Sequence, residues 1–122
     1  FNMEKILIVD DSKTSRKFLR NMLTGAGYEV VAEAVDGIDG VEKYKEYKPD
    51  VVTMDITMPN LDGIDAVTQI MRIDPDAKII MVTAAGQKNN VVEAIKRGAV
   101  DFVQKPFEAE AIVDVIKKAM EE

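Results

Sequence analysis

The chain of 122 residues contains no cysteine and no histidine. Disulfides are therefore excluded, as are metal sites built on thiolate or imidazole ligands and catalytic groups that need Cys or His. We expect any chemistry at a functional site to rely on carboxylates, hydroxyls and ammonium groups. A metal ion bound there would have oxygen ligands.

Long apolar runs are also missing, since none approaches the roughly 20 residues that a membrane-spanning helix needs. The start of the chain has no charged segment followed by an apolar one, as a secretory leader would have. These two absences predict a cytoplasmic protein that does not enter a membrane.

Basic residues are in the minority, because 16 Lys and Arg stand against 22 Asp and Glu and give a net charge of -6. A negative protein repels the phosphate backbone of nucleic acids and anionic lipid surfaces. Direct binding to nucleic acid is therefore not expected, and a basic or neutral protein surface is the more suitable partner.

The length predicts one domain, large enough to bury a core without disulfides or a structural metal. Phe1 and Asn2 precede Met3 and are interpreted as an expression remnant, so the domain is expected to cover residues 3–122.

Short apolar runs alternate with helical patterns along the whole chain. The predicted strands cover residues 5–9, 29–34, 51–54, 78–82 and 100–104. Each is followed by apolar residues at helical spacing, and the helices are expected to end near Gly25, before Pro49, before Pro75 and at Gly98. Strict alternation of this kind predicts an α/β fold with a doubly wound, five-stranded parallel sheet and five helices.

Polar residues stand where four of these strands end. They are Asp10 and Asp11, Asp55, Thr83 and Lys105. Ligands of such sheets bind outside the carboxyl ends of the strands, so these side chains are expected to converge. Clustered carboxylates repel one another and need a cation, and Mg²⁺ suits oxygen ligands. An aspartate can form an acyl phosphate with help from a metal and a lysine, so phosphoryl transfer is the predicted chemistry.

Simpler explanations exist for single residues, because Asp11 or Ser12 can act as a helix cap. Among whole-protein alternatives, an aspartate-based phosphatase usually has its two acids separated by one residue, whereas Asp10 and Asp11 are adjacent. A flavin-binding domain of the same topology needs a phosphate-binding loop of Ser, Thr or Gly after the first strand, where this chain has two acids. Gly25 and Gly27 follow a helix instead of a strand, so they are interpreted as a helix stop.

Five short motifs, in order along the chain, resemble the response-regulator receiver family. They are Val9-Asp10-Asp11-Ser12, Met54-Asp55-Ile56-Thr57-Met58-Pro59, Asp62-Gly63, Thr83-Ala84 and Lys105-Pro106-Phe107. The resemblance runs from about Met3 to the C-terminus and implies a flavodoxin-like sheet with strand order 2-1-3-4-5. The stretch 52–59, with residues 85–87, looks closest to the chemotaxis members of the family.

The resemblance also implies a role for each site residue. Asp55 is the expected phosphoacceptor, and Asp10, Asp11 and Asp55 are expected to bind Mg²⁺ together with the backbone carbonyl of Thr57. Lys105 is expected to pair with Asp55 and then with the phosphoryl group. The peptide bond between Lys105 and the following proline is expected to be cis, which would aim the lysine into the site.

Two further residues, Thr83 and Phe102, are the expected switch. The Thr83 hydroxyl is expected to move towards the phosphoryl group, while the ring at position 102 swings inward. Many receivers have tyrosine at that position, so contacts through a ring hydroxyl are not available to this chain.

The function that the resemblance implies is that of a response regulator in two-component signalling. A histidine kinase is the expected phosphodonor, and the protein is expected to catalyse its own phosphorylation and dephosphorylation without being an enzyme towards other substrates. In chemotaxis the downstream partners of a monomer would be the flagellar motor switch or a phosphatase. A phosphorelay intermediate and an isolated receiver domain of a larger regulator are the alternatives.

Overall fold

The computed structural model describes residues 3–121, and the prediction about Phe1 and Asn2 lies outside this range. Five strands alternate with five helices, as the sequence predicts. Their bounds are β1 Lys5–Val9, α1 Lys13–Gly25, β2 Glu29–Ala34, α2 Gly37–Tyr47, β3 Val51–Asp55, α3 Gly63–Ile73, β4 Ile79–Thr83, α4 Lys88–Arg97, β5 Asp101–Gln104 and α5 Ala109–Met120.

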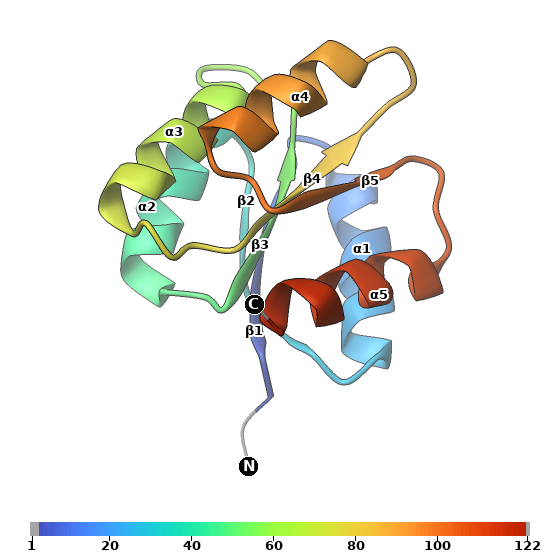
Figure 1. The fold of residues 1–122 in the computed structure, drawn as a ribbon. Coiled ribbons are helices and arrows are strands. Elements are labelled where there is room, and N and C mark those ends of the chain that lie inside the picture. Colours follow the sequence, from blue (N-terminus) through green and yellow to red (C-terminus); the bar gives the residue numbers. More distant parts are fainter. Residues whose placement is uncertain (1–2, 122) are drawn as a thin grey trace.

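All strand pairs are parallel, and the strand order is β2-β1-β3-β4-β5. Helices α2, α3 and α4 cover one face of the sheet, while α1 and α5 cover the other (Figure 1). The predicted doubly wound fold and its strand order are therefore confirmed. The order reverses at β1, which places β1 and β3 side by side at the centre.

Strand β1 is apolar on both faces because each face of the sheet packs against helices. Leu7 and Val9 of β1 face the side covered by α2, α3 and α4, whereas Ile6 and Ile8 face the side covered by α1 and α5. All four side chains are almost completely buried. This two-sided core holds the strand ends in a fixed register, and the polar residues that follow them share that rigidity.

Side-chain caps start three of the five helices. Ser12 caps α1, Asp36 caps α2 and Asp62 caps α3, each accepting a hydrogen bond from the backbone N–H three residues later. The helices α1 and α4 end at or next to the predicted glycines, and strands β4 and β5 each begin one residue later than predicted. The general prediction of helix ends is confirmed.

Gly63 lies where α3 comes closest to the end of β3. A Cβ atom at this position would lie 2.0 Å from the backbone oxygen of Asp55, which is far inside van der Waals contact. The Gly63 N–H also donates to the backbone oxygen of Ile56 at 2.7 Å. A side chain is therefore excluded at this position, and the glycine lets α3 fix the backbone that carries Asp55.

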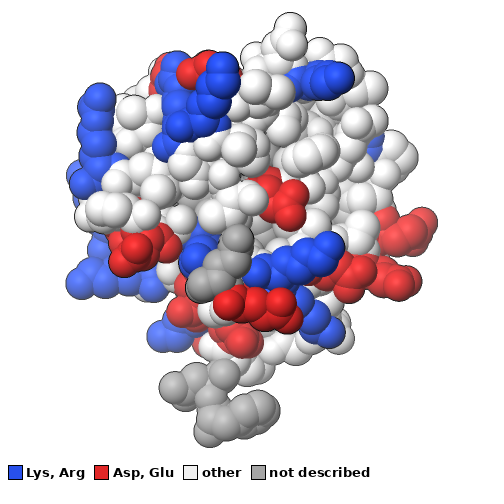
Figure 2. All heavy atoms as spheres, in the orientation of Figure 1, with Lys and Arg blue, Asp and Glu red and all other residues white. Residues whose placement is uncertain are grey.

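Charged side chains of both signs are interspersed over the face shown in Figure 2. Within residues 3–121, no helix has the length and apolar character that crossing a membrane requires.

Thr53, in the middle of β3, provides a test of the packing. It is 1% exposed, and its hydroxyl has no hydrogen-bond partner among the described residues. An unsatisfied buried hydroxyl is costly, so Thr53→Val should raise the free energy of unfolding by about 1 kcal/mol, measured by urea unfolding. Thr53→Ser keeps the hydroxyl and loses a methyl group, and it should lower that free energy by about 1 kcal/mol. A destabilised valine variant would show that the hydroxyl is satisfied in solution.

Candidate functional site

The polar residues predicted to converge do meet at the carboxyl edge of the sheet. Val9 pairs with Met54, so Asp10 and Asp55 follow neighbouring positions of β1 and β3. Asp55 pairs in turn with Val82, so Thr83 lies one residue further along β4. One oxygen from each of Asp10, Asp11 and Asp55 lies within 4.8 Å of the others. The three acids form a compact carboxylate cluster.

Asp10 is the most firmly held of the three acids. It is 3% exposed, its backbone N–H donates to the Ala34 carbonyl of β2 at 3.0 Å, and its carboxylate accepts from the Ser12 N–H at 2.8 Å. The second carboxylate oxygen lies 3.4 Å from the Lys105 ammonium. These partners offset the cost of burying a polar carboxyl group.

Arg16 is a supporting residue that no sequence pattern indicated. Its guanidinium donates to the backbone carbonyl of Asp10 at 2.7 Å and to the Glu33 carboxylate at 3.1 Å. Its side chain is 13% exposed. Arg20 also binds Glu33, from the next turn of α1. This network ties α1 and β2 to the backbone of the first acid, and residue spacing carries no signal of it.

Asp55 ends β3 and is half-buried. Its pKa is raised from the usual 3.8 to about 6, mainly by burial and also by the nearby charges of Asp10 and Asp11. The positive charge of Lys105 and the hydrogen bond from the Ile56 N–H act in the opposite direction. The Asp55 carboxyl group thus lies in a partly buried, negatively charged environment. It is mostly ionised only above about pH 6.

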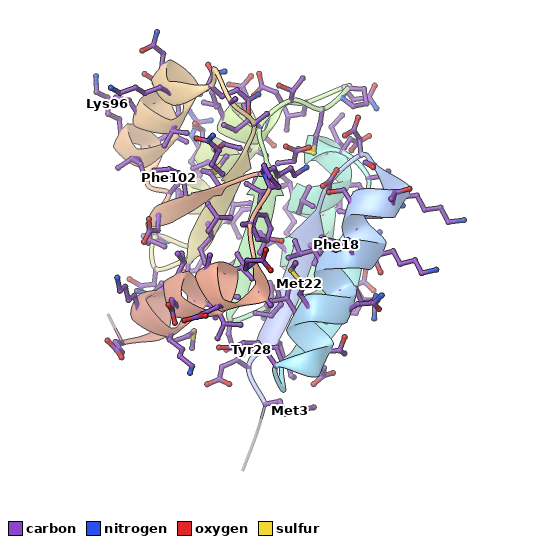
Figure 3. The ribbon with its side chains drawn as sticks, turned by 90° about the vertical axis from the view of Figure 1, so that its right-hand side faces the viewer. Met3, Phe18, Met22, Tyr28, Lys96 and Phe102 are labelled. Carbon is purple, nitrogen blue, oxygen red and sulfur yellow. The ribbon has the colours of Figure 1, made fainter. Side chains whose placement is uncertain are left out.

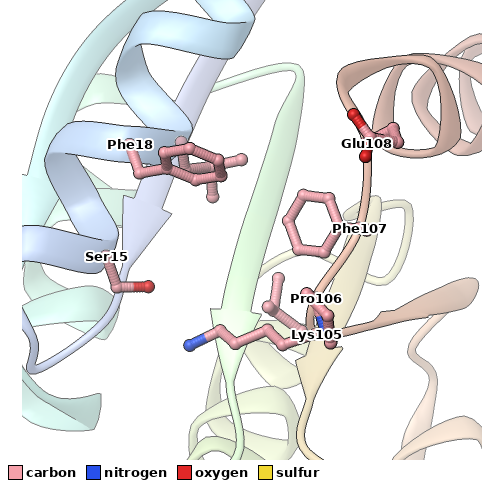
Figure 4. Close-up of a pocket in the computed structure, with 8 residues that line it drawn as sticks. Ser15, Phe18, Lys105, Pro106, Phe107 and Glu108 are labelled. Atoms are coloured by element: carbon pink, nitrogen blue, oxygen red, sulfur yellow. The ribbon is translucent and has the colours of Figure 1, made fainter.

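Lys105 follows β5, and the cis bond predicted between it and Pro106 is confirmed. Its side chain runs from the β5 side towards the α1 side, where Ser15 lies (Figure 4). An ion pair with Asp55 was expected, whereas the ammonium in this structure contacts Asp10. Its charge nevertheless lowers the pKa of Asp55, so it acts on both acids.

The two expected switch residues, Thr83 and Phe102, both make their contacts outside the carboxylate cluster. The buried Thr83 hydroxyl donates to the Val103 carbonyl of β5 at 3.3 Å. Phe102 is 45% exposed and lies on β5 beside α4 (Figure 3). The inward movement expected for both stays a prediction.

Thr57 lies two residues after Asp55, in the exposed loop between β3 and α3. Its hydroxyl accepts a hydrogen bond from the Gln87 side chain at 2.9 Å. The role of its backbone carbonyl as a metal ligand stays a prediction. Gln87 stands out in the sequence only as part of a stretch of family resemblance, because nothing in its spacing points to Thr57.

Comparisons with known proteins identify the family of this chain. The family model of the response regulator receiver domain matches residues 6–117. The chemotaxis protein CheY of Thermotoga maritima is 55% identical over 115 residues, which cover 94% of this chain and 96% of that protein. The CheY of Listeria monocytogenes is 51% identical over 117 residues, 96% of this chain and 98% of that protein.

Solved structures give the same result. A chain in the crystal structure of the CheX-CheY-BeF3-Mg complex from Borrelia burgdorferi superimposes with a TM-score of 0.90 and 36% identity, over 94% of this chain and 87% of that chain. Sequence and structure therefore agree that the chain belongs to the response regulator receiver domain family and is a regulator of two-component signalling.

Proposed function

We propose that the protein accepts a phosphoryl group from a histidine kinase on Asp55, in a Mg²⁺-dependent reaction that its own residues catalyse, and that it carries the signal in chemotaxis. The observation that carries this proposal is the cluster of Asp10, Asp11 and Asp55 with Lys105 at its edge. The similarity to proteins named CheY supports the chemotactic part.

Asp55 is the proposed nucleophile because it combines partial exposure with a place in the cluster at the end of β3, the middle strand of the sheet. In the reaction, one of its carboxylate oxygens bonds to the phosphorus of the donor. The bond from phosphorus to the donor's nitrogen or oxygen breaks, and its electron pair leaves with the donor. The attacking carboxylate must be ionised, which its pKa of about 6 allows near neutral pH.

Mg²⁺ fits the carboxylate cluster. Its ligands lie at about 2.1 Å, so two ligand oxygens of an octahedral ion are about 3 to 4 Å apart. The oxygens of Asp10, Asp11 and Asp55 fall within 4.8 Å of one another, close to that requirement. These residues would hold the ion, with the Thr57 carbonyl as a further ligand. When bound, Mg²⁺ neutralises charge on the phosphoryl oxygens.

Lys105 and Thr83 are the proposed partners of the phosphoryl group. The Lys105 ammonium is already next to the cluster, and its contact with Asp10 is long, at 3.4 Å, so it is able to turn towards a new anion. The Thr83 hydroxyl donates to a backbone carbonyl, which it would exchange for a charged acceptor. Phe102 would then move towards the space that Thr83 leaves.

The proposed partners are a histidine kinase and a downstream protein, either the flagellar motor switch or a phosphatase. One relative by structure is described in a complex of CheX with CheY, which supports a protein partner of this kind. A cytoplasmic location and a monomeric state belong to the same proposal.

The phosphoacceptor role predicts labelling without any kinase. Acetyl phosphate with Mg²⁺ should add one phosphoryl group to the intact protein, detected by mass spectrometry, because the catalytic groups lie in this chain. Asp55→Asn should remove the adduct, whereas Asp76→Asn, a change in the exposed loop before β4, should leave it unchanged. Full labelling of Asp55→Asn would refute the assignment of the phosphoacceptor.

The raised pKa of Asp55 predicts how stability depends on pH in metal-free buffer. Between about pH 4 and pH 6 the folded protein keeps a proton on Asp55 that the unfolded chain has lost, so the contribution of Asp55 to the free energy of unfolding falls as pH rises through this window. Asp55→Asn removes this loss. Its excess stability should grow from near zero at about pH 4 to about 1 kcal/mol at neutral pH, since solvent partly screens the half-exposed carboxylate. Urea unfolding at several pH values measures the difference, and an excess that does not change with pH would show that the Asp55 carboxyl is not its source.

The carboxylate cluster also predicts a metal response. Mg²⁺ binds the folded site and hardly binds the unfolded chain, so it should raise the melting temperature of the wild type. Asp11→Asn should lose most of this rise, and Asp55→Asn should show a smaller one. Glu110→Gln, an exposed change in α5, should respond as the wild type does. Melting curves at matched ionic strength decide the point, and equal shifts in all four proteins would mean that these acids do not bind the metal.

A further inference from the structure

The side chain of Gln87 connects two loops at the carboxyl edge of the sheet. Its carboxamide oxygen accepts a hydrogen bond from the Ala84 N–H at 2.6 Å, and its carboxamide nitrogen donates to the Thr57 hydroxyl at 2.9 Å. The carboxamide group of Gln87 thus forms a hydrogen bond through its oxygen and another through its nitrogen. We call this pair of hydrogen bonds the Gln87 clamp.

The two loops joined by the clamp are those that flank Asp55. Thr57 lies two residues after Asp55 at the end of β3, and Ala84 directly follows Thr83 at the end of β4. The two strands are neighbours, with Asp55 paired to Val82. The clamp therefore bridges the β3 and β4 loops next to the carboxylate that the proposed function places at the centre of the reaction.

A purely local role for Gln87 does not explain these contacts. Gln87 is the residue before α4, where a side chain often caps the helix. It makes no such capping hydrogen bond within the described part of the chain, and its carboxamide contacts Ala84 and Thr57 instead. Its backbone carbonyl does accept from the Val91 N–H at 3.0 Å, so the first turn of α4 is attached to the clamp.

The loop that carries Gln87 has the freedom to change if the clamp opens. Gly86 has a φ of +87°, and a Cβ atom there would meet nothing within 4 Å. A cavity of about 370 Å³ borders the loop and is lined by Gln87, Val91 and Phe102 among other residues. The loop is thus held by side-chain hydrogen bonds at an open edge, with little packing around it.

A phosphoryl group on Asp55 would disturb this arrangement. It brings close to two negative charges and three acceptor oxygens, which compete strongly for nearby donors. The neutral carboxamide oxygen of Gln87 is a weaker acceptor for the Ala84 N–H than a charged phosphoryl oxygen would be. The two loops would also have to move to make room for the phosphoryl group. The closed clamp therefore favours the unphosphorylated arrangement of the loops.

We propose that Gln87 is a positioning residue that holds the β3 and β4 loops together over unphosphorylated Asp55 and ties this state to the start of α4. Its loss makes rearrangement of the loops easier and so speeds phosphorylation. The inference rests on the proposed role of Asp55 as the phosphoacceptor.

The test measures the rate of labelling by acetyl phosphate at saturating Mg²⁺. Gln87→Ala should be labelled about fivefold faster than the wild type, the effect expected from losing a neutral hydrogen-bonded contact. Thr57→Val should also be faster, while keeping the backbone carbonyl. The double variant should be no faster than Gln87→Ala, because both changes break the same contact. Gln69→Ala, an exposed glutamine of α3, is the matched control and should keep the wild-type rate.

A second measurement reports on the clamp without any reaction. In the metal-free, unphosphorylated protein, the Ala84 amide should exchange its hydrogen faster in Gln87→Ala than in the wild type, while the melting temperature stays close to that of the wild type. Labelling of Gln87→Ala at the wild-type rate, or additive effects in the double variant, would overturn the inference and leave the phosphoacceptor role intact. A wild type that is not labelled at Asp55 would overturn the proposed function, and the inference with it.

Discussion

Repulsion among three carboxylates is the main physical constraint at the edge of the sheet where the strands have their carboxyl ends. Asp10, Asp11 and Asp55 bring oxygens within 4.8 Å of one another in a partly buried place. Water screens their charges poorly there, so the arrangement costs free energy unless other groups offset it. The neighbouring ammonium of Lys105 offsets part of the charge, and a divalent cation would offset more. The proposed binding of Mg²⁺ would relieve this repulsion.

The rest of the fold holds the acids against this repulsion. Parallel pairing fixes β1 next to β3, so the two strand ends have no freedom to separate. The backbone of Asp10 is held on both sides, by Ala34 of β2 and by the guanidinium of Arg16. Arg16 is in turn held in place by its ion pair with Glu33. Stability elsewhere in the domain thus compensates for an unfavourable local arrangement.

The fold and the composition of the site could be predicted because both follow from local patterns. Apolar runs of strand length mark the strands, and the residues after Val9, Met54 and Val82 must then reach the same edge. The contact of Lys105 with Asp10 instead of Asp55 was not predictable, because both acids lie within reach of a long side chain. The contact of Arg16 with Glu33 and that of Gln87 with Thr57 join residues 17 and 30 positions apart, and such pairs leave no periodic signal in the sequence.

Gly63 makes the backbone on the β3 side of the site more firmly held than the backbone on the β4 side. On the β3 side, the backbone of α3 lies so close to that of Asp55 that no side chain fits between them. The backbone on this side is therefore firmly held. On the β4 side, the chain after Thr83 is exposed and passes through the unencumbered Gly86. The proposed phosphorylation of Asp55 would therefore displace the less firmly held backbone after β4 more than the backbone after β3. Because α4 and β5 follow that backbone in the chain, they are the elements that such a displacement would reach.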